Sequence, residues 1–157
     1  DWLRYLASGL QLTDDQFHWI KHSGPTPSLR TGPSTDHTLA TASGSYMYIE
    51  ASLGLVGHTA CLQSPTFEEF NRGSCMRLWY HMYGSSIGQL DILLRDAGSK
   101  QITTLWSAEG MYAVSGELRE ILNLKLNHVS YQFEHSFLVM RFSQMLSTNF
   151  LLSKECG

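Results

Sequence analysis

Short segments of strand-forming residues, separated by clusters of glycine, proline and serine, recur along this chain. The segments rich in aromatic and branched residues are 17–22, 46–51, 76–82, 89–94 and 102–106. Strands that recur at intervals of about ten residues, with turn residues between them, are typical of an antiparallel β-sandwich. The chain also lacks the alternation of strands and helices that builds a parallel sheet. The pattern therefore predicts an all-β fold.

Three connecting segments carry their own predictions. Segment 23–33 holds three prolines and two glycines, which excludes a helix and favours an ordered loop. Segment 84–88 joins two predicted strands through two glycines, so a hairpin between 76–82 and 89–94 is expected. Segment 116–126 is the one stretch with a fair helical composition, and a short helix is expected there.

Size and charge narrow the class of protein. A length of 157 residues predicts one domain over 1–157, large enough to bury a core. The formal net charge is -3, with both signs scattered, so a basic nucleic-acid-binding surface is not expected. No apolar run approaches the roughly 18 residues that a membrane span needs. No signal peptide is recognisable, so we expect any leader or anchor to lie outside this sequence.

The cysteines are Cys61, Cys75 and Cys156, an odd number with no Cys-x-x-Cys pair. That spacing supports neither a zinc ribbon nor a thioredoxin-type redox site. Taken alone, the three residues fit either cytosolic thiols or one disulfide with a thiol left over. No Asn-x-Ser/Thr sequon occurs, so N-glycosylation of this segment is not expected.

Four ordered segments carry a resemblance to a known family. They read Gly-Pro-Ser-Thr-Asp-His-Thr at 32–38, Gly-Ser-Tyr-Met-Tyr-Ile-Glu at 44–50, Ala-Cys-Leu-Gln-Ser-Pro at 60–65, and Cys-Met-Arg-Leu-Trp-Tyr-His-Met-Tyr-Gly at 75–84. In this order and spacing they closely resemble the MAM domain, the extracellular module of meprins, neuropilins and mu-type receptor tyrosine phosphatases. The resemblance is clear over 14–110 and weak over 111–157. Residues 1–16 contain no cysteine, so the first disulfide of the family cannot form here.

The resemblance implies an antiparallel β-sandwich of jelly-roll type and a function without catalysis. It implies an extracellular protein-interaction or adhesion module, part of a larger secreted or membrane-anchored protein. The partners would be proteins, including a second copy, with no nucleic acid and no membrane insertion by the domain itself. The family's second disulfide would join Cys75 to Cys156, leaving Cys61 as a buried thiol. The tryptophans and tyrosines are expected mostly in the core.

Asp36, in the first matched segment, has two interpretations. Carboxylates beside glycine and proline in loops suit calcium, which takes six to eight oxygen ligands, and some MAM domains hold such an ion. Alternatively, its side chain accepts hydrogen bonds from nearby backbone N–H groups, as in an Asx turn. No cofactor is expected beyond this candidate calcium. His37 and His81, which stand at matched family positions, are expected to be structural.

Two other function classes stay open. Residues 84–88 match the Gly-x-Ser-x-Gly nucleophile elbow of α/β hydrolases, with Ser86 as nucleophile. Asp91 or Asp96, followed by His128 or His135, would complete the triad in the right order. However, a strand rather than a helix is predicted after Ser86, which favours a hairpin turn. The other alternative is an intracellular β-sandwich that binds a small ligand or a carbohydrate.

Overall fold

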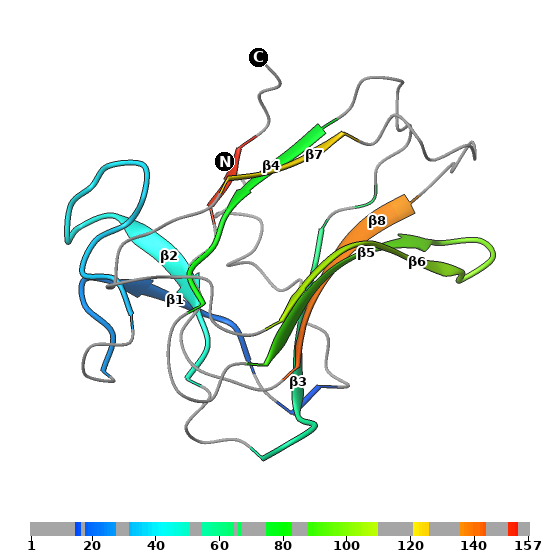
Figure 1. The fold of residues 1–157 in the computed structure, drawn as a ribbon, viewed down its shortest axis with the longest axis horizontal. Coiled ribbons are helices and arrows are strands. Elements are labelled where there is room, and N and C mark those ends of the chain that lie inside the picture. The colour runs from blue at the N-terminus through cyan, green and yellow to red at the C-terminus, as the bar shows by residue number, and fades with distance from the viewer. Residues whose placement is uncertain are drawn as a thin grey trace.

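The chain folds into antiparallel strands that form three sheets (Figure 1). The computed structural model describes residues 15–16, 18–27, 32–50, 55–64, 66, 75–82, 88–109, 121–125, 136–143 and 151–153. The strands are β1 Ile20–Ser23, β2 Ser45–Tyr48, β3 Thr59–Gln63, β4 Cys75–Trp79, β5 Gln89–Asp96, β6 Ile102–Glu109, β7 Ile121–Lys125, β8 Ser136–Ser143 and β9 Leu151–Ser153. Within these ranges every regular element is a strand.

The largest sheet has four strands in the order β3-β8-β5-β6, and a second has three in the order β7-β4-β9. The pair β1-β2 forms the third sheet, on the left of Figure 1. All the strand pairs of these sheets are antiparallel. The predicted antiparallel β-sandwich of jelly-roll type is confirmed. Its sequence-distant strands, such as β3 and β8, lie side by side.

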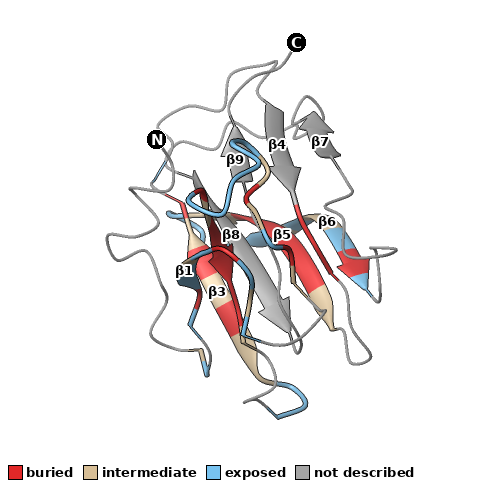
Figure 2. Cartoon of the chain, turned by 90° about the vertical axis from the view of Figure 1, so that its left-hand side faces the viewer, coloured by how far each residue is buried: buried red, intermediate tan, exposed pale blue. Residues whose placement is uncertain are grey.

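The core follows from the alternation of side chains along β5. Leu90, Ile92 and Leu94 lie on one face and are at most 2% exposed. The strand registers place Ala60 of β3 and Ala108 of β6 in the same row as Leu90, and both are buried. Figure 2 shows this buried band running along β5 and alternating on β3. Each such leucine or isoleucine contributes roughly 1.5–3 kcal/mol through burial.

An aromatic contact joins the two larger sheets. Tyr80, directly after β4 of the three-stranded sheet, meets Trp106 of β6 edge to face, with ring centroids 5.3 Å apart. Such a pair stabilises by about 0.5–1.5 kcal/mol beyond the burial of its area. The expected aromatic core is largely present, since Tyr80 is 2% exposed and Trp106 is half-buried. Trp19, Tyr46 and Tyr48 are buried as well, at 3%, 1% and 1% exposure.

Two local predictions are wrong. β4 and β5 do not form a hairpin, because β4 pairs with β7 and β9 whereas β5 pairs with β6 and β8. The connection between β4 and β5 therefore joins the three-stranded sheet to the four-stranded sheet. The expected helix over 116–126 is also wrong where the structure describes it, since Ile121–Lys125 is strand β7. There, pairing with β4 overrides the helical propensity of the segment.

Tyr46 provides a test of packing between β2 and the loop that follows β1. Its hydroxyl donates a hydrogen bond to the Gly24 carbonyl, and burial raises the pKa of Tyr46 to about 12. Because the folded pKa lies above the unfolded value of 10.0, this contribution is present below pH 10 and lost towards pH 12. We expect Tyr46→Phe to destabilise the domain by about 1–2 kcal/mol at neutral pH.

The measurement is urea unfolding of both proteins between pH 7 and 11. The loss of stability above about pH 10 should be shallower in Tyr46→Phe than in the wild-type protein. Equal alkaline slopes would show that Tyr46 ionises as easily in the folded chain as in the unfolded one.

Candidate functional site

The loop between β1 and β2 is organised around one buried carboxylate. Asp36 is 3% exposed, and its two oxygens accept hydrogen bonds from the backbone N–H groups of Leu39, at 2.8 Å, and Thr41, at 3.3 Å. Gly44 packs against the same carboxylate, because a Cβ built at Gly44 would lie 1.8 Å from Asp36 Oδ1. The Asp and the Gly of the two matched segments therefore form one structural unit.

This unit presents an apolar side chain at its surface. Leu39 is 63% exposed, and the next residue, Ala40, has a positive φ of 52° that a side-chain-bearing residue seldom adopts. The two hydrogen bonds to Asp36 lie on either side of Ala40 and hold the turn in that conformation. His37 lies beside Asp36, and burial lowers the pKa of His37 although the Asp36 charge opposes the shift. The loop is thus pre-organised around Leu39.

The surroundings of Asp36 bear on the calcium interpretation. Calcium takes six to eight oxygen ligands, whereas both Asp36 oxygens face N–H donors. Among the described residues, no group of three or more His, Cys, Asp or Glu side chains is placed to hold a metal ion. The donor set near Asp36 therefore fits the capping role better than a cation site.

We accordingly predict that calcium leaves the thermal stability of the domain unchanged. A ligand that binds only the folded state raises the stability by RT ln(1 + [L]/Kd), so millimolar Ca²⁺ reveals any site of micromolar affinity. The measurement is the melting temperature in Ca²⁺ and in EDTA, for the wild-type protein and for Asp36→Asn. A rise with Ca²⁺ that disappears in Asp36→Asn would instead assign Asp36 as a ligand.

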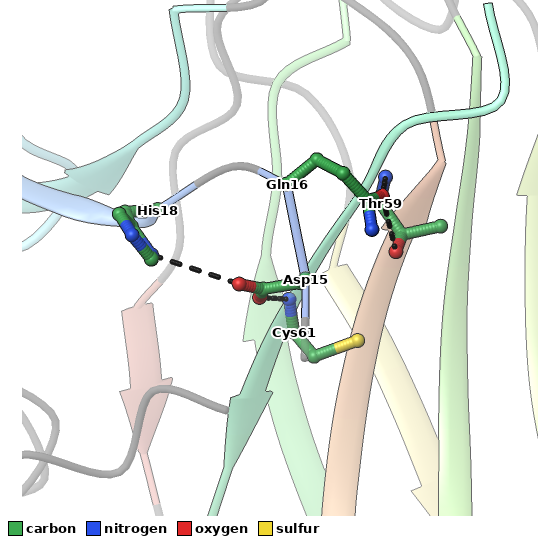
Figure 3. Close-up of polar contacts among 5 residues, drawn as sticks. All are labelled: Asp15, Gln16, His18, Thr59 and Cys61. Atoms are coloured by element: carbon green, nitrogen blue, oxygen red, sulfur yellow. Dashed lines mark hydrogen bonds and ion pairs between the residues drawn. The ribbon is translucent and has the colours of Figure 1, made fainter. Parts of the chain in front are cut away.

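A second polar cluster joins the chain before β1 to the outer edge of β3 (Figure 3). The Gln16 N–H donates to the Thr59 carbonyl, and the Thr59 N–H donates to Gln16 Oε1, both at 3.1 Å. The Cys61 N–H donates to Asp15 Oδ2 at 2.6 Å. The other Asp15 oxygen lies 3.6 Å from His18 Nδ1, and the Asp15 side chain is only 2% exposed. We call the residues Asp15 and Gln16 the edge latch.

A third cluster lies on the face of the four-stranded sheet opposite to Leu90 and Ile92. Asp91 of β5 is 2% exposed and accepts hydrogen bonds from Gln89 Nε2, at 2.7 Å, and from the Ser107 hydroxyl. The Asp91 carboxylate is therefore hydrogen-bonded to side chains of β5 and β6 within the sheet. Sequence reasoning assigned Asp91 only to a hydrolase triad and missed this cluster.

The hydrolase alternative gains no support from the described residues. Ser86, His128 and His135 lie outside them. Asp96 caps the β5–β6 turn by accepting hydrogen bonds from the Ser99 N–H and hydroxyl, a role that a turn aspartate commonly fills. Nor do Cys61 and His18 form a nucleophile–base pair, since Figure 3 shows the Cys61 sulfur pointing away from His18.

The cysteines and histidines take structural positions where they are described. Cys61 is half-buried rather than buried, because alternation along β3 turns Ala60 and Leu62 to the core instead. Cys75 begins β4, whereas Cys156 lies outside the described residues, so their disulfide stays a prediction. His81 is fully buried, at 0% exposure, in line with a structural role.

Apolar side chains are also exposed at a second loop. Leu55 and Val56 are 68% and 85% exposed at the turn before β3. Gly57, with φ of 91°, and a hydrogen bond from the His58 N–H to the Leu55 carbonyl close this turn. Well-built loops with outward-facing apolar side chains are suited to contact with another protein. No helix in the described residues is long and apolar enough to cross a bilayer.

Comparison with solved structures defines the class of fold. The adhesin domain K1 of Lys-gingipain from Porphyromonas gingivalis W83 aligns with a TM-score of 0.55 at 13% identity, covering 93% of this chain and 89% of that one. A structure titled for carbohydrate-binding modules of the β-sandwich superfamily aligns with a TM-score of 0.52 at 9% identity, covering 84% of this chain and 50% of that one. At such identities the likeness concerns the fold alone, a β-sandwich.

The sequence comparisons then give the family. The profile described as "MAM domain, meprin/A5/mu" matches residues 7–148, so this chain belongs to the MAM domain family. It is 37% identical over 97 residues to MAM domain-containing protein 2 of Homo sapiens and 38% identical over 100 residues to Neuropilin-1a of Danio rerio. It is 39% identical over 110 residues to MAM domain-containing glycosylphosphatidylinositol anchor protein 2 of Mus musculus.

These relatives are much longer than the matched region. The alignments cover 62%, 62% and 61% of this chain, but only 14%, 10% and 12% of the relatives, in the same order. The resemblance drawn from the four motifs is therefore confirmed at the level of the domain. The functions of the full-length relatives are therefore not assigned to this one domain.

Proposed function

We propose that this chain is a non-enzymatic extracellular interaction module that associates with protein partners, a second copy included, within a larger secreted or membrane-anchored protein. The observation that carries the proposal is the family match over residues 7–148. A relative named as a glycosylphosphatidylinositol anchor protein supports the extracellular, membrane-attached setting. The exposed Leu39, Leu55 and Val56 on ordered loops support a contact role.

The contact surface would be of ordinary size. Stable interfaces bury about 800 Å² on each partner, with a few apolar anchors at the centre and a polar rim. The loop 32–44 supplies the anchor Leu39 together with exposed polar neighbours, such as Ser34 and Thr38. Because Asp36 holds this loop in place, little conformational entropy is lost when it binds.

The test is deletion of the domain from the intact extracellular region. Sedimentation and partner capture are measured with and without residues 1–157, and with the variant Leu39→Ser in the full-length protein. We expect deletion to abolish association and Leu39→Ser to weaken it. The matched control is Ile102→Ser, an exposed apolar residue on a different element. If deletion leaves both self-association and partner binding unchanged, the domain is a spacer and the proposal fails.

The fold likeness to carbohydrate-binding modules favours a second candidate, a sugar-binding domain. Of the tryptophans and tyrosines whose burial is described, Trp19, Tyr46, Tyr48 and Tyr80 are buried and the half-buried Trp106 packs against Tyr80, which weighs against a sugar-stacking surface. A glycan array distinguishes the two functions. Binding there, with no protein partner captured, would favour the sugar-binding alternative.

A further inference from the structure

Among the described residues, β3 itself has none of the charges, prolines or bulges that usually protect an edge strand from pairing with another strand. β3 is the outermost strand of the four-stranded sheet and reads Thr-Ala-Cys-Leu-Gln, with no charge and no proline. Its pairing with β8 has a regular register. The opposite edge strand, β6, differs because its register with β5 shifts between Ile92 and Leu93, as at a β-bulge. Exposed edges are normally blunted by bulges, charges or prolines.

On β3 the edge latch protects the edge instead of a bulge, a charge or a proline. Asp15 and Gln16 bind the N–H groups of Thr59 and Cys61 and the carbonyl of Thr59, which point away from β8 (Figure 3). One of the three hydrogen bonds is between backbone groups, whereas the other two use the side chains of the latch. Such bonds contribute about 0.5–3 kcal/mol each, so another strand that offers the same bonds can replace them.

We propose that the β3 edge is a strand-addition surface for a second copy of this chain, which the edge latch covers. Alternation turns the backbone groups of Thr59, Cys61 and Gln63 to the same side. An antiparallel copy centred on Cys61 places Cys61 opposite its own counterpart and Thr59 opposite Gln63 of the partner. The edge is therefore complementary to itself about a two-fold axis, and without charges it does not repel its copy. The two four-stranded sheets would become one continuous sheet.

The inference rests on the proposed function and specifies its self-association. The latch then acts as an autoinhibitory contact, since the chain cannot pair at β3 until Asp15 and Gln16 leave the edge. Asp15 is the stronger of the two contacts, because a carboxylate acceptor makes a shorter and stronger bond than an amide oxygen. Removing the Asp15 side chain should therefore promote association more than removing the Gln16 side chain.

The test is sedimentation equilibrium of the domain carrying Asp15→Ala and Gln16→Ala. We expect the dimerisation Kd to fall at least about tenfold relative to the wild-type domain. Asp96→Ala is the matched control, because it removes a carboxylate that accepts backbone hydrogen bonds in a turn remote from β3, and it should associate as the wild-type domain does. Adding Thr59→Pro to the latch variant should restore the monomer, since proline removes an edge N–H at the first residue of the strand.

Mild oxidation gives an independent readout. Directly opposite residues in an antiparallel pair lie about 5.5 Å apart between Cα atoms, within reach of a disulfide, so Cys61–Cys61 crosslinks should accumulate faster in the latch variant. If the double variant does not fold, Asp15→Asn is measured in its place and should dimerise to a smaller extent. A folded latch variant that stays monomeric overturns this inference. If deletion of the domain still abolishes partner binding in that case, the proposed function stands.

Discussion

Replacing Gly44 with alanine should destabilise the domain by about 3 kcal/mol or more, a large effect for the addition of one methyl group. The new Cβ would lie 1.8 Å from Asp36 Oδ1 and 2.0 Å from its Cγ. The carboxylate cannot swing away without losing its hydrogen bonds to the N–H groups of Leu39 and Thr41. Because Asp36 is buried, the displaced carboxylate would also have to find new space and new hydrogen-bond partners inside the fold.

Two glycines provide matched controls for this substitution. A Cβ at Gly98 would meet Asp96 Oδ1 at 3.6 Å, an ordinary contact, so Gly98→Ala should change stability by less than about 0.5 kcal/mol. Gly57 has φ of 91° and open space around it, so Gly57→Ala should cost only its backbone strain, about 1–2 kcal/mol. The measurement is the free energy of unfolding in urea for all three variants.

A double-mutant cycle isolates the cause. Asp36→Ala removes the atoms that clash with the new methyl group, so Gly44→Ala should cost much less in that background than in the wild-type domain. Additive effects of the two changes would show that the contact with Asp36 is not the reason why Gly44→Ala destabilises the domain.

Of the strands in the described residues, β1, β2, β4, β5 and β6 overlap segments predicted from the sequence, whereas β3, β7, β8, β9 and the pairing of the strands were not predicted. β5 is marked by its apolar run Ile-Leu-Leu at 92–94, and β6 by the branched and aromatic residues of 102–106. The sequence of segment 84–88 is typical of a hairpin turn, although β4 and β5 pair in different sheets. Local residues determine where a chain turns, but the choice of partner strand depends on contacts between segments far apart in the sequence. β7 was missed for the same reason.

The candidate site, too, could be predicted from the sequence only in part. The capping of local N–H groups by Asp36 was one of its two predicted interpretations, whereas its packing against Gly44 was not predicted. The edge latch could not be predicted, since Gln16 and Thr59 are 43 residues apart and segment 15–16 has no periodicity. A carboxylate just before a predicted strand is a weak signal, and only the fold brings Asp15 to the Cys61 N–H.

The arrangement of β4 and β9 supports the disulfide predicted between Cys75 and Cys156. β9 runs antiparallel to β4, with Leu151 opposite Trp79 and Ser153 opposite Arg77. The chain leaves β9 in the direction of Cys75, which precedes Arg77 by two residues, and Cys156 follows Ser153 by three. Two or three residues of extended chain span about 7–10 Å, so the two cysteines can reach each other without any change in the sheet.

Removing this disulfide should have the largest effect on stability of any change predicted for this domain. A bridge that closes a loop of about 80 residues stabilises by roughly 4 kcal/mol on the chain-entropy model, so Cys75→Ser should cost about that much. Cys156→Ser should match it, and the double variant should cost no more than either single one. Cys61→Ser, on a half-buried face of β3, is the matched control and should cost less than about 1 kcal/mol.

Urea unfolding with and without reductant measures the free energies of unfolding, and non-reducing peptide mapping identifies the two cysteines that form the disulfide. A Cys61–Cys75 link, or three reduced thiols in the native protein, would show the pairing to be wrong, and the stability of Cys75→Ser would then match that of Cys61→Ser.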